Sequence, residues 1–272
     1  MYPWYVSPSR GVIPTFFTFR TMIRPTPEVL PESEKSRFDP FFPLLDYNCP
    51  MPRLFPKGSL YLPGLLYDLA FAWMFRGLRR RVAAAVKEGG LYPWLDICCG
   101  TGSQLRGHVP RVRVPGLVPD PVVCGLDLSL GFVRYAAARA PGVPFVCGDA
   151  ARLPFRDGSV LAVSVSFALH DKPPDLRRAI IAEARRVLAR DGRLIAVDFE
   201  RPWDRRSRWG MRFSAAVELF ARGDHYRNGR DFVDRGGLRA FLSENGFFEV
   251  SRTDISTGSL SIVVARAGPT QA

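Results

Sequence analysis

Short apolar runs that alternate with helical stretches constrain the fold of this chain more than any other feature of its sequence. The runs occupy residues 93–98, 122–126, 143–147, 160–167 and 193–199, and helical stretches at residues 130–139 and 175–190 lie between some of them. Short, fully apolar strands that alternate with helices specify a parallel sheet covered on both faces. The sequence therefore predicts an α/β fold.

The C-terminal part follows a different pattern. A helical run at residues 238–245 ends at Gly246, and the segments FFEVSRTDI and SLSIVVARA then face each other across Ser256, Thr257 and Gly258. Such a pair of segments around a short turn is typical of a hairpin. We therefore expect five parallel strands closed by a C-terminal antiparallel hairpin, and no internal repeat competes with this arrangement.

Residues 1–57 are predicted to form an irregular arm in front of a domain at residues 58–268. Half of the 24 prolines precede residue 64, mixed with aromatic residues, and this composition cannot sustain helical or strand periodicity. Three explanations of the arm stay open: partial disorder, a translation start further upstream, or wrapping of the core by its aromatic side chains. A helix at residues 65–86, apolar first and arginine-rich later, is expected to pack beside the functional site rather than lie on a membrane.

Cysteine usage and apolar runs bound the class of protein. Four of the five cysteines lie in or beside strand-like runs, so they are expected to be reduced and buried. Adjacent Cys98 and Cys99 lack the spacing of metal ligands, and no metal site is expected. The chain has no apolar run of 18 residues and no secretory signal layout, which favours a cytoplasmic location.

The net charge of +12 suggests an anionic partner, such as nucleic acid, an acidic membrane surface or a phosphorylated substrate. Only four of the basic residues are lysines, and the arginines are spread over many helix faces. A solvated basic surface is therefore favoured over a dedicated polyanion site.

The first motif is LDICCGTGS at residues 95–103, where a strand runs into a turn. Gly100 and Gly102 lack a Cβ, so a ligand can lie against the backbone. The third glycine of the dinucleotide fingerprint would fall at Leu105, and Asp96 lies at the strand end before the turn. A carboxylate there suits the ammonium group of a methionine moiety and would repel a pyrophosphate.

Two further acids follow the next two strands. Asp127, in VVCGLDLS, can accept both hydroxyls of a ribose, although it could instead cap the helix that begins near Leu130. Asp149, in VPFVCGDAARLPF, can accept a hydrogen bond from an adenine amino group, with Ala150 and Leu153 as apolar contacts. Acids at three consecutive strand ends of one sheet point to one shared ligand.

The motifs LDICCGTG, GLDLS and GDAARLPF resemble the three successive cofactor motifs of class I S-adenosylmethionine-dependent methyltransferases, and the similarity spans about residues 65–266. The resemblance implies a Rossmann-like seven-stranded sheet that binds S-adenosyl-L-methionine. The cofactor residues that it implies fall on all three motifs and on the fourth strand. They are Asp96, Cys98, Gly100, Thr101, Gly102, Asp127, Leu128, Asp149, Ala150 and Phe167.

Within that superfamily, YDLAFAWMF, LPFRDGSVLAVSVSFALHD and the C-terminal segments are most similar to the C-methyltransferases of menaquinone and ubiquinone biosynthesis, the methyltransferase type 11 domain group. This resemblance implies a small, aromatic or quinone-like acceptor. Three departures stand out: Cys98 replaces a glycine or alanine, prolines interrupt residues 107–121, and His170 with Asp171 replaces an Arg-Asn pair.

Methyl transfer is an in-line displacement that needs alignment and exclusion of water, and a general base helps when the acceptor is a phenol or hydroquinone. His170, after the fourth strand, is the predicted base, with capping or pocket lining as the alternative. Tyr67 is a comparable candidate. Residues 200–236 are predicted to form a lid whose arginines meet an anionic group or an anionic membrane surface. They are Arg205, Arg206, Arg208 and Arg212.

Two rival functions are retained. A nucleic-acid (RNA) methyltransferase fits the basic charge, but amino-methylating enzymes of that class carry Asn/Asp-Pro-Pro-aromatic after the fourth strand, where this chain reads SFALHD. A non-catalytic module that binds S-adenosylmethionine fits the three acids equally well. A small-molecule methyltransferase remains the preferred interpretation.

Overall fold

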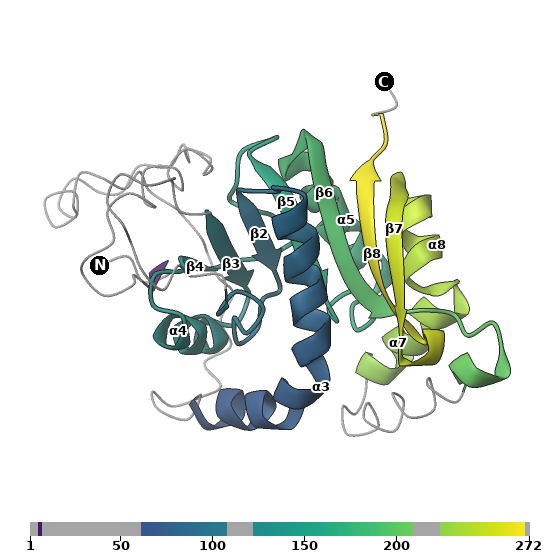
Figure 1. Ribbon diagram of the computed structural model, residues 1–272, viewed down its shortest axis with the longest axis horizontal. Coiled ribbons are helices and arrows are strands. Elements are labelled where there is room, and N and C mark those ends of the chain that lie inside the picture. Colours follow the sequence, from purple (N-terminus) through teal and green to yellow (C-terminus); the bar gives the residue numbers. More distant parts are fainter. Residues whose placement is uncertain (1–4, 7–60, 108–121, 209–223, 270–272) are drawn as a thin grey trace, which may run out of the picture.

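The computed structural model describes residues 5–6, 61–107, 122–208 and 224–269, which form one sheet covered by helices (Figure 1). Its eight strands run in the order β1-β4-β3-β2-β5-β6-β8-β7. The five parallel strands are β2 (Trp94–Ile97), β3 (Val123–Asp127), β4 (Phe145–Cys147), β5 (Val160–Ser166) and β6 (Leu188–Phe199). The hairpin consists of β7 (Phe247–Ile255) and β8 (Leu260–Ala267), and β8 pairs antiparallel with β6. All seven predicted strands are confirmed.

The eighth strand comes from the N-terminal arm. Strand β1 (Tyr5–Val6) pairs antiparallel with β4, so that Tyr5 faces Val146 and Val6 faces Phe145. Composition did not predict this strand, because two residues are too few to show periodicity. The rest of the arm lies outside the described residues.

Helices cover both faces of the sheet. Helices α3 (Tyr61–Glu88) and α4 (Leu130–Arg139) pack on one face, and α5 (Pro174–Val187), α7 (Asp224–Asp234) and α8 (Gly237–Glu244) on the other (Figure 1). Neighbouring residues of β2 show the division, because Trp94 belongs to the same buried cluster as Val82 of α3, while Leu95 belongs to the cluster that contains Ile180 of α5. This alternation follows from the two-residue period of a strand.

One predicted boundary was wrong. The helical pattern continues to residue 190, but α5 ends at Val187 and Leu188 is extended, with φ −68° and ψ 131°. Leu188 instead begins β6 opposite Val160 and is buried. Its side chain gains more from the core than from another helical turn, which illustrates how tertiary packing overrides helix propensity.

The strand order shows which end of the sheet is suited to bind a ligand. The chain leaves β2 for β3 on one side and comes back to β5 on the other, so β2 and β5 are neighbours whose connections diverge. In open α/β sheets, such a switch point opens a crevice at the carboxyl ends of the strands. None of the described helices has the length and apolar character needed to cross a bilayer.

Candidate functional site

A cavity of about 340 Å³ lies at the carboxyl ends of β2 and β5. It brings together five of the residues predicted to hold the cofactor: Asp96, Cys98, Gly100, Thr101 and Phe167. Its remaining lining comes from α3, the glycine turn, α4, the end of β5 and α7. These residues are Leu78, Arg79, Cys99, Ser103, Gln104, Phe132, Ser166, Asp171 and His225.

Strained backbone marks both central strand tips. Cys98 follows β2 and Phe167 follows β5, and each has a φ of 54°. Bulky side chains rarely adopt this left-handed conformation, and such residues cluster at functional sites. Both side chains line the cavity, so the strained backbone coincides with the predicted ligand site.

The two glycines of the turn have different roles. A Cβ on Gly102, where φ is 66°, would lie 2.7 Å from Ala136 Cβ and Phe145 Cζ. A Cβ on Gly100, where φ is 51°, would meet no atom within 4 Å. Gly102 therefore lets the turn pack on α4 and β4, whereas Gly100 leaves open space in the cavity wall.

Asp96 is the buried acid of the cavity. Its side chain is on the α3 face of β2, and Oδ1 accepts a hydrogen bond from Ser164 Oγ, its register neighbour on β5. Ser164 Oγ in turn accepts a hydrogen bond of 2.7 Å from Trp94 Nε1. Burial, with a smaller contribution from Asp127, raises the pKa of Asp96 to about 7, although the Ser164 hydrogen bond opposes the shift. A bound cation would stabilise the ionised form.

Asp127 ties the second strand tip to the glycine turn. Gly100 N donates to Asp127 Oδ2 at 2.8 Å, and Ser129 N donates to Oδ1 at 2.9 Å. Each carboxylate oxygen has two lone pairs, so both retain the capacity to accept a ribose hydroxyl. Ser129, rather than Asp127, is the N-cap of α4, since its side chain accepts a hydrogen bond from Phe132 N. Asp127 contacts Gly100, which lines the cavity, but is not itself part of the lining.

The third strand tip presents less apolar surface than the sequence suggested. Asp149 Oδ1 accepts a hydrogen bond from Ala151 N at 2.9 Å, and Ala150 and Leu153 belong to the buried core. Leu128, after β3, instead exposes 54% of its surface. An exposed leucine between two polar strand tips is a suitable apolar contact for an adenine ring.

Sequence reasoning missed Asp68, a buried carboxylate on α3. It accepts hydrogen bonds from Thr101 Oγ1 at 2.7 Å and Tyr135 OH at 3.0 Å, and Arg106 Nη2 lies 2.5 Å from its Oδ2. Asp68 thus joins α3 to the glycine turn and to α4. The sequence feature that could have revealed Asp68 is an acidic residue inside the apolar half of a helix, because a buried charge needs partners.

His170 is placed behind the cavity rather than in its wall. Its side chain is buried, and Nδ1 lies 2.6 Å from Asp198 Oδ1 on β6. Asp198 also accepts backbone hydrogen bonds from Leu169, His170 and Phe199, the last at 2.8 Å. The His170 ring packs edge-on against Phe199, with 4.6 Å between centroids. Its role as base stays a prediction.

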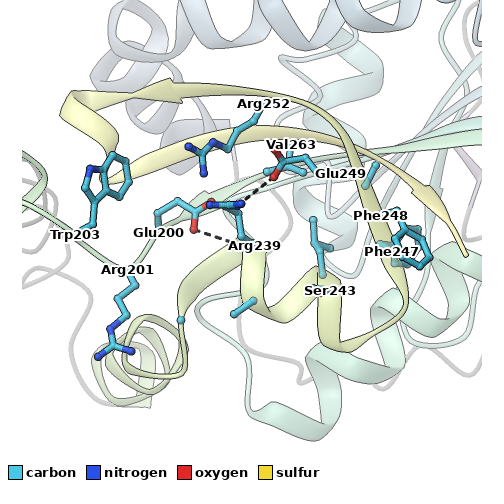
Figure 2. A pocket seen from close by; sticks show the side chains of 14 residues that line it. Glu200, Arg201, Trp203, Arg239, Ser243, Phe247, Phe248, Glu249, Arg252 and Val263 are labelled. Atoms are coloured by element: carbon cyan, nitrogen blue, oxygen red, sulfur yellow. Dashed lines mark hydrogen bonds and ion pairs between the residues drawn. The ribbon is translucent and has the colours of Figure 1, made fainter.

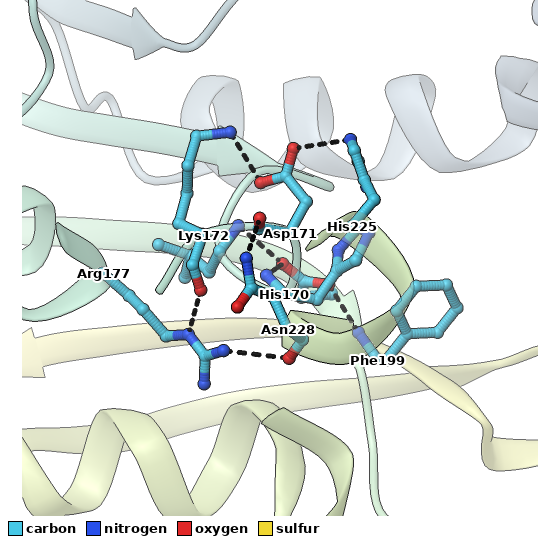
Figure 3. A network of polar contacts seen from close by, with 9 residues as sticks. His170, Asp171, Lys172, Arg177, Phe199, His225 and Asn228 are labelled. Atoms are coloured by element: carbon cyan, nitrogen blue, oxygen red, sulfur yellow. Dashed lines mark hydrogen bonds and ion pairs between the residues drawn. The ribbon is translucent and has the colours of Figure 1, made fainter. Parts of the chain in front are cut away.

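A second imidazole, which the sequence analysis overlooked, does line the cavity. His225 Nε2 on α7 lies 3.1 Å from Asp171 Oδ2, and Lys172 Nζ lies 2.6 Å from Asp171 Oδ1 (Figure 3). The Asp171 backbone oxygen accepts a hydrogen bond from Asn228 Nδ2 at 2.9 Å. Buried Arg177 donates to the backbone oxygens of Lys172 and Asn228, which holds α7 against this segment.

Some predicted features lie outside the described residues. Tyr67 is on α3, but its side chain is not described, and the proline-rich stretch 108–121 and lid residues 209–223 are also outside. Arg212 falls in that gap, while Arg205, Arg206 and Arg208 are exposed. Helix α7 belongs to the part of the predicted lid that the structure describes. Because residues 209–223 are not described, the lid as a whole stays a prediction.

None of the described cysteines forms a disulfide, and burial raises the pKa of the Cys98, Cys99 and Cys124 thiols. Within the described ranges, no group of three or more His, Cys, Asp or Glu side chains is arranged to hold a metal ion.

A second, larger cavity of about 580 Å³ lies between α8 and the hairpin (Figure 2). Glu200, Arg239 and Glu249 form its polar centre: Arg239 Nε lies 3.2 Å from Glu249 Oε2, and Ser261 Oγ donates to Glu200 Oε1 at 2.6 Å. Burial raises the pKa of Glu200. This cavity is at the hairpin edge, away from the switch point, so the first cavity is the better candidate for the reaction.

Comparisons with known proteins identify the family of the chain. Residues 95–192 match the family described as "Methyltransferase domain". The demethylmenaquinone methyltransferase of Beutenbergia cavernae is 32% identical over 184 residues, which cover 63% of this chain and 72% of that protein. The enzyme of the same name from Streptomyces griseus is 30% identical over 195 residues, covering 68% and 80%.

A solved structure, that of the CurJ carbon methyltransferase, shares the fold, with a TM-score of 0.55 at 20% identity. The similar region covers 79% of this chain and 60% of that one. The sheet, its switch-point cavity and the identity to relatives over most of their length lead to one conclusion. The chain belongs to the class I S-adenosylmethionine-dependent methyltransferases, near the demethylmenaquinone methyltransferase group.

Proposed function

We propose that this methyltransferase transfers the methyl group of S-adenosyl-L-methionine to a small aromatic acceptor of the quinone or quinol type. The observation that carries the proposal is the composition of the switch-point cavity. Its lining includes the aromatic residues Phe132 and Phe167, the buried acid Asp96, and the polar pair of Asp171 and His225. Curated relatives named demethylmenaquinone methyltransferase support a quinone-type acceptor.

The residues present fit the cofactor. We assign the methionine part to Asp96 and the glycine turn, because an ionised carboxylate pairs with an ammonium group and Gly100 leaves open space beside it. We assign the ribose to Asp127, whose oxygens keep free lone pairs. We assign the adenine to Asp149 and the exposed Leu128, because the side chain of Ala150 is buried. When bound, the cofactor supplies an activated methyl group. The chain orients the acceptor and keeps water from the cavity.

Binding and turnover test separate parts of the proposal. Calorimetry should detect binding of S-adenosylmethionine to the wild type and lose it in Asp127→Ala, while Asp175→Ala, an exposed acid on α5, leaves it unchanged. Transfer of labelled methyl to a dithionite-reduced 1,4-naphthoquinone with one prenyl group should follow. Binding without transfer to this quinol, simple phenols or RNA would favour a non-catalytic module, and transfer to RNA alone would favour the nucleic-acid alternative.

Contact with an anionic membrane surface remains a separate proposal. Arg205, Arg206 and Arg208 are exposed near Trp203, which exposes 57% of its surface. Exposed basic residues beside an aromatic side chain suit a membrane interface. Sedimentation with phosphatidylserine vesicles should show binding that weakens with added salt, whereas neutral vesicles should bind none.

A further inference from the structure

We propose that His225, oriented by Asp171, is the general base that takes the proton from a hydroxyl of the acceptor. The inference rests on the proposed function and deepens it, because it requires an acceptor with an acidic hydroxyl beside the methylated atom. The observation that supports the inference is a carboxylate–imidazole pair in the lining of the switch-point cavity, with one imidazole nitrogen facing the carboxylate.

The ion-pair contact with Asp171 favours one tautomer of His225. A carboxylate only accepts hydrogen bonds, so it stabilises the tautomer with the hydrogen on Nε2, the nitrogen 3.1 Å from Asp171 Oδ2. In neutral imidazole the other nitrogen, Nδ1, then holds the lone pair that can accept a proton. A carboxylate that orients a histidine in this way also stabilises the imidazolium ion formed during catalysis.

Asp171 is itself held in place. Lys172 Nζ contacts its other carboxylate oxygen, and Asn228 of α7 donates to its backbone oxygen. Arg177 reaches from α5 to Lys172 O at 2.8 Å and to Asn228 O at 2.9 Å (Figure 3). Asp171 and His225 therefore come from two segments that share one buried clamp, which gives the pair a defined geometry.

Accessibility distinguishes the two histidines of this region. His225 exposes 46% of its side chain and lines the cavity, whereas His170 exposes 6% of its side chain and does not line it. Their ring centroids are 6.3 Å apart. An acceptor in the cavity therefore reaches His225 first, and His170 with Asp198 supports the strand end behind it.

The proton and electron balance is simple. The hydroxyl proton of the acceptor moves to His225 Nδ1, and the oxygen, or the ring carbon beside it, forms a bond to the methyl carbon. The methyl–sulfur bond breaks with its electron pair on sulfur, so the sulfonium becomes a neutral thioether. Carbon attack is completed when the ring proton is lost and the oxygen is reprotonated, so either course releases one proton. Half-exposed His225 passes that proton to solvent.

Several charged or titratable groups lie near His225. The segment after β5 contributes Asp171, Lys172 and His170, which is held by Asp198 of β6. Asp96 and Arg79 belong to the same cavity lining as His225.

The first test compares methyl transfer to the reduced prenyl-naphthoquinone in the wild type and four variants. His225→Gln should lower kcat by about 100-fold, the lower range for a general base, and leave the KM for S-adenosylmethionine unchanged. Asp171→Asn should lower kcat in the same way, and Tyr226→Phe, an exposed neighbour on α7, should behave as wild type. A fall in kcat that occurs in His170→Gln and not in His225→Gln would overturn the proposal.

The second test needs no turnover. With S-adenosylhomocysteine present, the wild type should bind 4-nitrophenol as its visibly absorbing phenolate, and His225→Gln should bind it as the neutral phenol at the same pH. Equal phenolate fractions in both proteins, or no binding to the wild type, would overturn the assignment of His225. If calorimetry finds no S-adenosylmethionine binding, the proposed function fails. The phenolate fraction of bound 4-nitrophenol, measured without S-adenosylhomocysteine, then still tests whether His225 takes the proton.

Discussion

Thr101 Oγ1 donates a hydrogen bond of 2.7 Å to Asp68 Oδ1, which joins the turn after the first parallel strand to the long helix that crosses the sheet. The two residues are 33 positions apart in the sequence. This contact fixes the turn on which the proposed cofactor site depends, because Gly100 and Gly102 on either side of Thr101 are both in left-handed conformations.

Replacing Asp68 with alanine should destabilise the fold and weaken cofactor binding together. Its carboxylate is buried against Arg106 Nη2 at 2.5 Å, and removing one partner of such a pair costs about 3–5 kcal/mol. Urea unfolding should measure the loss. Tyr135→Phe removes only one hydrogen bond and should cost about 1 kcal/mol. A wild-type midpoint for Asp68→Ala would show that the contacts of Asp68 contribute nothing.

Asp96 should make cofactor affinity depend on pH. Its pKa is raised by burial to about 7, and a cationic ligand pairs with the ionised form. Affinity for S-adenosylmethionine should therefore strengthen as the pH rises through about 7, with proton release on binding. Calorimetry in buffers of different ionisation enthalpy measures that release. Asp96→Asn should release no proton and bind about 10–100-fold more weakly at pH 8, which corresponds to loss of a charge-assisted hydrogen bond.

The raised pKa of Asp96 should also make the stability of the free protein depend on pH. Its contribution to the free energy of unfolding should fall as the pH rises, whereas the affinity for S-adenosylmethionine should increase. The folded-state pKa lies above the unfolded value, so the native state holds the proton more tightly. The contribution of Asp96 to the free energy of unfolding is full below the ordinary aspartate pKa and is lost as the pH rises through about 7. The difference between wild type and Asp96→Asn in urea unfolding should change along this range, and a constant difference would contradict the raised pKa.

The two glycines of the turn should respond differently to alanine. Gly102→Ala places a methyl 2.7 Å from Ala136 Cβ and Phe145 Cζ in a left-handed residue, and should cost about 2–4 kcal/mol of stability. Gly100→Ala meets no atom within 4 Å and should cost about 1 kcal/mol from backbone strain alone. The second variant should fold but bind S-adenosylmethionine at least 10-fold more weakly, because its methyl occupies the proposed ligand space. Thermal unfolding and calorimetry together distinguish the two cases.

Asp198→Asn should be strongly destabilising, although it is nearly isosteric. Four hydrogens face the two carboxylate oxygens, three of them from the backbone N–H groups of Leu169, His170 and Phe199. An asparagine amide has one acceptor oxygen, so at least one buried N–H group would face its amino group. We expect a loss of about 3 kcal/mol by thermal unfolding. His170→Gln, which leaves the backbone contacts intact, should lose less, and an equal loss would show that the His170 side chain dominates the network.

The sequence by itself determined the sheet and the positions of its strand tips. Strand periodicity and apolar runs report local burial, so they located β2 to β8, and the helix predicted at residues 130–139 is the observed α4. The acids of the motifs were correctly placed at consecutive tips because a tip is where an apolar run ends. The boundary at Leu188 failed because its burial depends on pairing with Val160, a residue distant in sequence.

Only the tertiary structure decided which side chains meet. Asp96 and Phe167 share one cavity because the strand order makes β2 and β5 neighbours, and the spacing of motifs does not encode that order. His225 drew no attention in the sequence because nothing local marks it, yet the packing of α7 sets it against Asp171. Contacts of this kind depend on the order of strands and the direction of helices, which are fixed by the burial of the whole core rather than by the residues that finally touch.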